Sequence, residues 1–337
     1  MKRRAFGSGL SIFVVSVFFC ASCTSSPTAG KDPNALRIGY SAWPGWLPLT
    51  VAEEQQKFAA NNAGINLQWF DGYLDSLNTL AAGQLDANTL SLQDTINAVA
   101  AGADLVAVVV TDYSTGNDQI IVSEGINSVG ELKGKTVAAE ESTVYFLLRL
   151  ALEKAGLTLE DIEFQPLEAG ASAAAFVAGQ VDAVSVYAPF TSKATQRSGS
   201  KVIFSSKDVP GAIPSAIVFQ RETIENRPEA VQAFVNAWFD TLAFMEYNPE
   251  TAYEMMAKRA GVSVEEYKEY AAGTNLLSLE ENLTAFTPGN DLNSVYYAAE
   301  QVSNFLVETG LAQQKPDIDG LFDDRFVKAY AQQREQE

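Results

Sequence analysis

The feature of this chain that most restricts its fold is a near-repeat of eight residues. Residues 80–87 read Leu-Ala-Ala-Gly-Gln-Leu-Asp-Ala, and residues 176–183 read Phe-Val-Ala-Gly-Gln-Val-Asp-Ala. Each copy has the pattern of a helix end, a glycine stop and a short strand. Two copies that lie roughly a hundred residues apart do not form a stacking array of the solenoid kind. The repeat therefore predicts two similar lobes.

A strand, a turn and a helix precede each copy of the repeat. In the first half, the pattern predicts a strand at residues 36–40 and a helix at residues 49–60. In the second half, it predicts a strand at residues 136–139 and a helix at residues 144–155, which Gly156 ends. This alternation predicts an α/β fold in which parallel sheets are covered by helices. A length of 337 residues also suits two domains.

The division into lobes follows from two further apolar runs. We expect residues 119–123 to lead the chain out of the first lobe and residues 216–220 to return it. We therefore assign residues 36–118 and 215–337 to the first lobe, and residues 119–214 to the second. The tail that follows is expected to be mostly helical, with apolar residues at helical spacing that pack into the core.

The amino terminus has the composition of an export signal. Basic residues at positions 2–4 precede an apolar stretch at residues 10–19, which is too short for a membrane span. Small residues then lead to Cys23, as in a lipoprotein signal in which this cysteine is acylated. We expect residues 1–23 to be this signal and residues 24–35 to be a flexible tether, rich in Ser, Thr, Gly and Pro. The alternative is plain secretion into the periplasm after cleavage nearby.

The residue types exclude several classes of function. The chain has no histidine, and both of its cysteines, Cys20 and Cys23, lie in the expected signal. The folded body therefore lacks the groups for histidine or thiol catalysis and the usual metal ligands, and we expect no enzyme, no metal and no cofactor. With 23 basic and 42 acidic residues, the net charge is -19, which argues against nucleic acid or an anionic membrane surface as a partner. The acidity serves either solubility or the binding of a cation.

Polar and aromatic side chains gather where the predicted strands end. In open α/β sheets, ligands bind beyond the carboxyl ends of the strands, near helix N-termini. The candidate ligand-binding residues at these ends are Trp43, Trp46, Asp71, Ser91, Asp94, Asp112, Glu140, Glu141 and Tyr187. The set combines carboxylates with aromatic faces and contains no basic residue. It suits a cation that is both stacked and hydrogen-bonded, above all a planar guanidinium.

A structural interpretation of some of these residues stays open. Asp94 is also suited to cap a helix, and Glu140 and Glu141 are suited to complement a helix dipole. The aspartates of the repeat, Asp86 and Asp182, are expected to be structural turn residues. The ligand-binding interpretation is favoured over these structural roles because several carboxylates are expected to converge on one cleft.

Several segments of the chain resemble one known family. They are the repeat at residues 80–86, Ser-Val-Gly-Glu-Leu-Lys-Gly-Lys-Thr-Val at residues 128–137, Leu-Glu-Lys-Ala-Gly-Leu at residues 152–157, and Gly39-Tyr40 before an aromatic turn. These segments are similar to the nitrate/sulfonate/taurine-type substrate-binding proteins of ABC importers, and relatives of the thiamine-precursor type share the pattern. The resemblance covers nearly all of the chain beyond residue 36.

The resemblance implies a two-lobe fold of the periplasmic-binding-protein kind (type II), with a ligand cleft between the lobes. Such proteins close around their ligand by hinge motion. The resemblance further implies a monomer that delivers a small molecule to the permease and ATPase subunits of an ABC importer. Its expected place is the periplasmic side of a bacterial membrane, anchored through lipid at Cys23.

Within this family, the chain looks most like the branch associated with guanidine or urea-type nitrogen compounds. Anion-binding members usually have small or basic residues where this chain has Glu140 and Glu141. We therefore expect a solute-binding component for a small cationic nitrogen compound, with guanidine favoured. The alternatives are an anion (nitrate, a sulfonate or taurine) or a pyrimidine-type thiamine precursor. An enzyme on the same fold is a third hypothesis, which the absence of histidine and the export signal disfavour.

Overall fold

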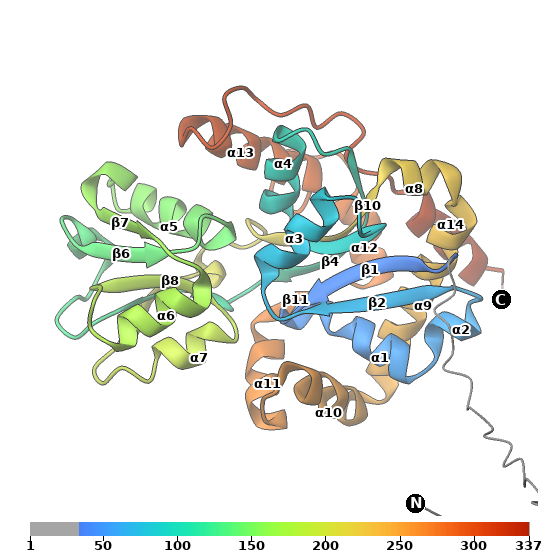
Figure 1. The fold of residues 1–337 in the computed structure, drawn as a ribbon, viewed down its shortest axis with the longest axis horizontal. Coiled ribbons are helices and arrows are strands. Elements are labelled where there is room, and N and C mark those ends of the chain that lie inside the picture. The colour runs from blue at the N-terminus through green and yellow to red at the C-terminus, as the bar shows by residue number, and fades with distance from the viewer. Residues whose placement is uncertain (1–33, 337) are drawn as a thin grey trace, which may run out of the picture. The chain divides into compact units, whose positions relative to one another are not determined.

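The computed structural model describes residues 34–336 of the chain. The expected signal with Cys23, and almost all of the expected tether, lie outside the described residues. Within residues 34–336, no helix is both long enough and apolar enough to cross a membrane. The described chain forms two β-sheets, each accompanied by helices (Figure 1).

The six-stranded sheet has the strand order β11-β4-β10-β3-β1-β2. Its strands are β1 (Leu36–Ser41), β2 (Ile65–Phe70), β3 (Ala87–Ser91), β4 (Leu105–Ser114), β10 (Pro214–Gln220) and β11 (Thr274–Leu276). Strand β1 pairs in parallel with β2 and β3. Strand β10 runs antiparallel to both β3 and β4, and β11 runs antiparallel to β4.

The five-stranded sheet has the strand order β7-β6-β8-β5-β9. Its strands are β5 (Asp118–Val122), β6 (Thr136–Ala139), β7 (Glu163–Pro166), β8 (Ala183–Tyr187) and β9 (Lys201–Ser205). Strand β6 is parallel to β7 and β8, whereas β5 is antiparallel to β8 and β9. The chain passes from the first sheet to the second between β4 and β5, and returns between β9 and β10 (Figure 1).

The expectation of parallel sheets is therefore met only in part. Strands β5 and β10 are the ones by which the chain enters each sheet from the other. They start at the edge where the parallel strands end, so they run in the opposite direction. No helix lies between β4 and β5, which belong to different sheets.

The near-repeat has the predicted local structure in both sheets. Helices α3 (Tyr73–Ala81) and α6 (Ala169–Val177) end just before Gly83 and Gly179, which adopt positive φ angles of 69° and 74°. Glycine tolerates this left-handed conformation, which explains the stop. The repeat aspartates also play matching roles, since Asp86 accepts a hydrogen bond from the Arg37 amide and Asp182 accepts one from the Thr136 amide. Each aspartate thus ties its turn to the first parallel strand of its sheet.

The remaining helices cover the sheets and fill the C-terminal third. They are α1 (Pro48–Glu54), α2 (Lys57–Ala60), α4 (Leu92–Ala100), α5 (Thr143–Lys154), α7 (Phe190–Ala194), α8 (Arg221–Asn226), α9 (Pro228–Tyr247), α10 (Pro249–Ala260), α11 (Val264–Ala272), α12 (Leu279–Ala285), α13 (Val295–Glu308) and α14 (Arg325–Arg334). Helix α9 starts with proline, whose missing N–H is unneeded at that position, and its apolar side is buried in the first core as expected. Helix α13 instead packs with residues of α4 and α5 in a second core.

Candidate functional site

A tight aromatic turn follows β1 at the edge where the parallel strands end. It contains Trp43 and a single turn of 3-10 helix, Pro44–Trp46. The indoles of Trp43 and Trp46 are only 6% and 4% exposed, and their ring centroids lie 6.3 Å apart. Gly45 lets the turn lie against Asp112, because a Cβ atom at this position would stand 2.0 Å from the Asp112 carboxylate. The turn is therefore packed closely enough to hold both rings in fixed positions.

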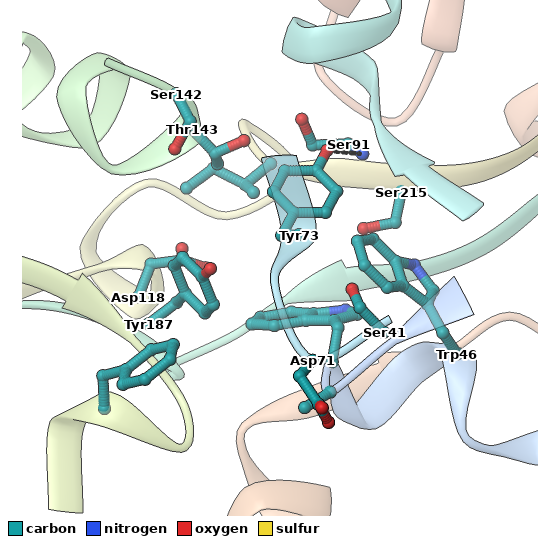
Figure 2. A pocket seen from close by; sticks show the side chains of 14 residues that line it. Ser41, Trp46, Asp71, Tyr73, Ser91, Asp118, Ser142, Thr143, Tyr187 and Ser215 are labelled. Atoms are coloured by element: carbon teal, nitrogen blue, oxygen red, sulfur yellow. Dashed lines mark hydrogen bonds between the residues drawn. The ribbon is translucent and has the colours of Figure 1, made fainter. Parts of the chain in front are cut away.

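Further rings from both sheets complete an aromatic wall. Tyr73, at the start of α3, lies 5.4 Å from Trp46 between ring centroids. Tyr187, at the end of β8, lies 6.4 Å from Trp43 and 5.4 Å from Phe190. Figure 2 shows Tyr187 at the left and Trp46 at the right of the view, with Tyr73 between them.

These rings enclose a cavity of about 50 Å³. The cavity is lined by Ser41, Ala42, Trp43, Trp46, Asp71, Tyr73, Ser91, Asp118, Ser142, Thr143, Tyr187, Phe190, Ile213 and Ser215. Five of the predicted site residues are thus brought together, namely Trp43, Trp46, Asp71, Ser91 and Tyr187. Over the described part of the chain, no basic side chain lines this cavity.

Asp118 is the buried carboxylate of the cavity, and sequence reasoning missed it. It starts β5, pairs in register with Tyr187 of β8, and is only 2% exposed. Its Oδ2 atom accepts no hydrogen bond from any residue that the structure describes. Burial raises its pKa to about 7, the nearby Ser114 hydroxyl opposes this rise, and the charge of Asp112 adds a smaller increase. The one available signal was an aspartate at the head of an apolar strand, at the crossover between the sheets.

Asp94 lies directly behind the cavity wall and is bound to two of its lining residues. The Tyr73 hydroxyl donates to Asp94 Oδ2 at 2.8 Å, and the Ser91 hydroxyl donates to the same oxygen at 2.6 Å. Ser91 is the N-cap of α4, and its hydroxyl oxygen accepts a hydrogen bond from the Asp94 amide at 3.0 Å. Burial raises the pKa of Asp94 in spite of these hydrogen bonds. Asp94 therefore orients hydroxyl groups of the cavity and does not line it.

Asp112 has a similar supporting position beneath Trp43. It is fully buried and accepts hydrogen bonds from Trp43 Nε1 at 2.9 Å and from the Thr111 hydroxyl at 2.7 Å. Burial raises its pKa to about 7. Asp112 thus fixes the orientation of the indole that forms the floor of the cavity.

The remaining predicted carboxylates lie at different depths. Asp71 is exposed at the rim of the cavity, where its Oδ1 atom accepts a hydrogen bond from the Trp69 indole N–H at 2.7 Å. Figure 2 places Asp71 at the lower edge of the cavity. Glu140 is buried and lines a neighbouring cavity together with Asp71. Glu141 is exposed and lines neither cavity, because it stands one residue beyond Glu140 at the turn into α5.

Comparison with known proteins places these features in a family context. The model of the NMT1-like family matches residues 29–260. The chain is similar to the periplasmic aliphatic sulphonate binding protein SsuA of Escherichia coli, with 27% identity and a TM-score of 0.70 over 86% of this chain and 92% of that structure. A structure of the alkanesulfonate-binding protein SsuA of Xanthomonas axonopodis pv. citri, bound to MOPS, gives 21% identity and a TM-score of 0.71 over 88% and 100%. These similarities confirm the two-lobe periplasmic-binding fold (type II).

Two further similarities bear on function. The taurine-binding periplasmic protein of Escherichia coli is 24% identical over 78% of this chain and 83% of its own length. The desulfurization enzyme DSZB matches at 17% identity with a TM-score of 0.64, over 89% of this chain and 99% of the enzyme. At that identity, the likeness to the enzyme concerns the fold alone.

Proposed function

The chain belongs to the NMT1-like family, and on this premise we propose that it is the solute-binding component of an ABC importer whose cavity takes a small organic cation, guanidinium first. The observation that supports this ligand class most is Asp118, a buried carboxylate with an unpartnered oxygen at the cavity wall. A buried ionised carboxylate is costly unless it is paired with a cation.

The surrounding rings suit a cation as well. The faces of aromatic rings attract cations, and the indole ring is the strongest of these partners. A guanidinium is flat, so it stacks on a ring while it donates two parallel N–H bonds to a carboxylate. The cavity of about 50 Å³ also has room for only a few non-hydrogen atoms, which agrees with a ligand of this size.

The arrangement of hydroxyl groups argues against an anion. An anion site at a helix N-terminus uses free donors, whereas both Ser91 and Tyr73 already donate to Asp94. Among the described residues that line the cavity there is no Lys or Arg to neutralise an anion. An anion would also lie against Asp118, whose charge repels it.

A sulfonate such as taurine is the second candidate, and the comparisons with known proteins support it better than they support guanidinium. The named relatives bind sulphonates or taurine. In addition, Trp46 Nε1 is buried at the cavity without a hydrogen-bond partner in the described chain, and a sulfonate oxygen would accept a hydrogen bond from it. This ligand requires Asp118 to be protonated, so its affinity should increase at low pH.

We propose binding without turnover. The relatives named above are binding proteins, and the enzyme shares the fold alone. The sequence offers no histidine and no cysteine beyond residue 23 to serve as a nucleophile or base. We further propose that the two sheets close on the ligand about the β4–β5 and β9–β10 crossovers, and that the closed form is presented to the permease and ATPase subunits.

The proposed place of the protein is the periplasmic side of a bacterial membrane, anchored through Cys23, and its proposed state is a monomer. Globomycin, which blocks the lipoprotein signal peptidase, should leave the precursor uncleaved if the anchor is formed. Cleavage that continues in its presence would favour plain secretion.

Isothermal titration of the purified protein tests the ligand class. We expect one-to-one binding of guanidinium chloride at concentrations far below those that denature, and no heat from sodium nitrate or taurine under matched ionic strength. Binding of taurine or nitrate with none for guanidinium would replace the cation by the second candidate class.

A further inference from the structure

We propose that the ligand carries two cationic groups, and that the second group occupies an acidic cavity next to the first. This inference rests on the proposed function, because it assumes a cation at Asp118. The second cavity measures about 140 Å³ and is referred to here as the acidic chamber. Its charged lining residues are Asp71, Asp75, Glu140 and Glu168.

The acidic chamber adjoins the aromatic cavity directly. Asp71, Tyr73, Tyr187 and Phe190 line both spaces. Both sheets contribute to the chamber, with Asp71 and Asp75 at the start of α3 and Glu168 and Ala169 at the start of α6. A ligand that extends from one space to the other therefore passes along the two tyrosine rings and contacts both lobes.

Glu140 gives the acidic chamber an unpaired acceptor. Its side chain is 95% buried, since the residue is only 5% exposed. The Ala169 amide donates to Oε2 at 3.1 Å, whereas no donor of the residues described meets hydrogen-bond geometry at Oε1, although the Ser142 hydroxyl is near enough to lower the pKa of the carboxyl slightly against the effect of burial. A carboxylate that served only to hold the start of α6 would need one oxygen, so the second oxygen remains for a ligand.

Tyr187, which lines the chamber, is surrounded by negative charge. Burial raises the pKa of Tyr187, and the charges of Glu140, Asp94, Asp118 and Glu168 raise it further. Among residues 34–336, the one basic side chain that hydrogen-bonds a lining residue of the chamber is Lys193, whose Nζ lies 3.4 Å from the Gly170 carbonyl oxygen. One lysine leaves an excess of negative charge, which a second cationic group of the ligand would offset.

These positions define the chemistry of the ligand. A flat guanidinium or amidinium group would pair with Asp118 among the indoles. A short apolar linker would lie along Tyr73 and Tyr187, and an ammonium group, a compact cation with several donors, would reach Glu140. The ligand class is therefore an aminoalkyl guanidine or a related short dication.

A matched pair of probes tests this inference. Aminobutylguanidine and butylguanidine share the guanidinium and the linker, and differ in the terminal ammonium. Titration at pH 8, with intrinsic tryptophan fluorescence as a second readout, should give a Kd for aminobutylguanidine lower by on the order of tenfold or more, as a charge-assisted hydrogen bond predicts. Equal Kd values, or tighter binding of butylguanidine, would overturn the inference.

Two variants assign the effect to the chamber. Glu140→Gln keeps the shape and should bring the two Kd values together while the Kd of guanidinium itself changes by less than about twofold. Glu168→Gln, at an exposed position that tolerates substitution, should reduce the difference in the same direction. If Glu140→Gln weakens guanidinium as much as aminobutylguanidine, the chamber is not a separate subsite and the inference is wrong. If neither guanidine binds but taurine does, the proposed function has failed as well, which is a distinct result.

Discussion

Asp118→Asn is the substitution that tests most directly whether a buried, unpaired carboxylate forms the site. In the folded protein, burial raises the Asp118 pKa from 3.8 to about 7. A raised carboxyl pKa stabilises the folded protein below the unfolded pKa, and this stability is lost as the pH rises through about 7. One pKa unit corresponds to about 1.4 kcal/mol, so ionised Asp118 costs the unliganded protein at most roughly 4 kcal/mol at pH 8.

Asparagine cannot ionise, and the variant therefore avoids this cost. We expect Asp118→Asn to raise the free energy of unfolding by up to about 4 kcal/mol at pH 8 and by less than about half as much at pH 5, because the unfolded chain already ionises Asp118 above its ordinary pKa of 3.8. The same change should weaken guanidinium binding at pH 8 by roughly tenfold to a hundredfold, because a charged hydrogen-bond partner is lost. The protein gains stability and loses its ligand.

Urea unfolding followed by tryptophan fluorescence is the appropriate assay, since guanidinium is the proposed ligand and cannot serve as the denaturant. Glu254→Gln, at an exposed position on α10, is the matched control and should show no difference between the two pH values. If Asp118→Asn is less stable than the parent at pH 8, or if its effect is the same at pH 5 and pH 8, the reasoning from an unpaired buried charge is refuted.

Three further predictions concern pH, the indole floor and helix α13. Affinity for guanidinium should fall as the pH is lowered from 8 to 6, since Asp118 takes up a proton near pH 7. Titration in two buffers of different ionisation enthalpy should then reveal that a proton is released on binding. A rise in affinity at pH 6 would contradict a cationic ligand. Trp43→Phe removes a donor from buried Asp112 and should lower the free energy of unfolding by about 1–3 kcal/mol at pH 8. The loss should shrink at pH 5, where Asp112 is neutral, and an equal loss at both values would argue against this hydrogen bond. Phe305→Ala should cost about 3–5 kcal/mol in urea unfolding, because its ring is buried where α13 packs with α4 and α5. Val307→Ala, exposed on the same helix, is the control, and similar losses for both would count against this packing.

The aromatic residues of the cavity can be predicted from the sequence because they stand next to recognisable strand and turn patterns. Trp43 and Trp46 follow a predicted strand within a turn, and Tyr187 ends another. Glu140 and Glu141 were grouped together for the same reason, yet only Glu140 lines a cavity. Their difference depends on how the turn into α5 directs each side chain, which a spacing rule does not specify.

The sequence by itself determined the two-sheet α/β plan, the helix–glycine–strand form of the repeat and the acidic, aromatic character of the site. These depend on contacts between residues near one another in the chain, and on residue chemistry. Only the tertiary structure places Asp118 and Ser215 in the cavity wall, because both stand at the starts of strands. In a parallel sheet, ligand-binding residues stand at the ends of strands, whereas β5 and β10 enter their sheets in the opposite direction and so bring their first residues to the same edge. Strand direction is set by pairing with partners far away in the sequence, and no local pattern records it.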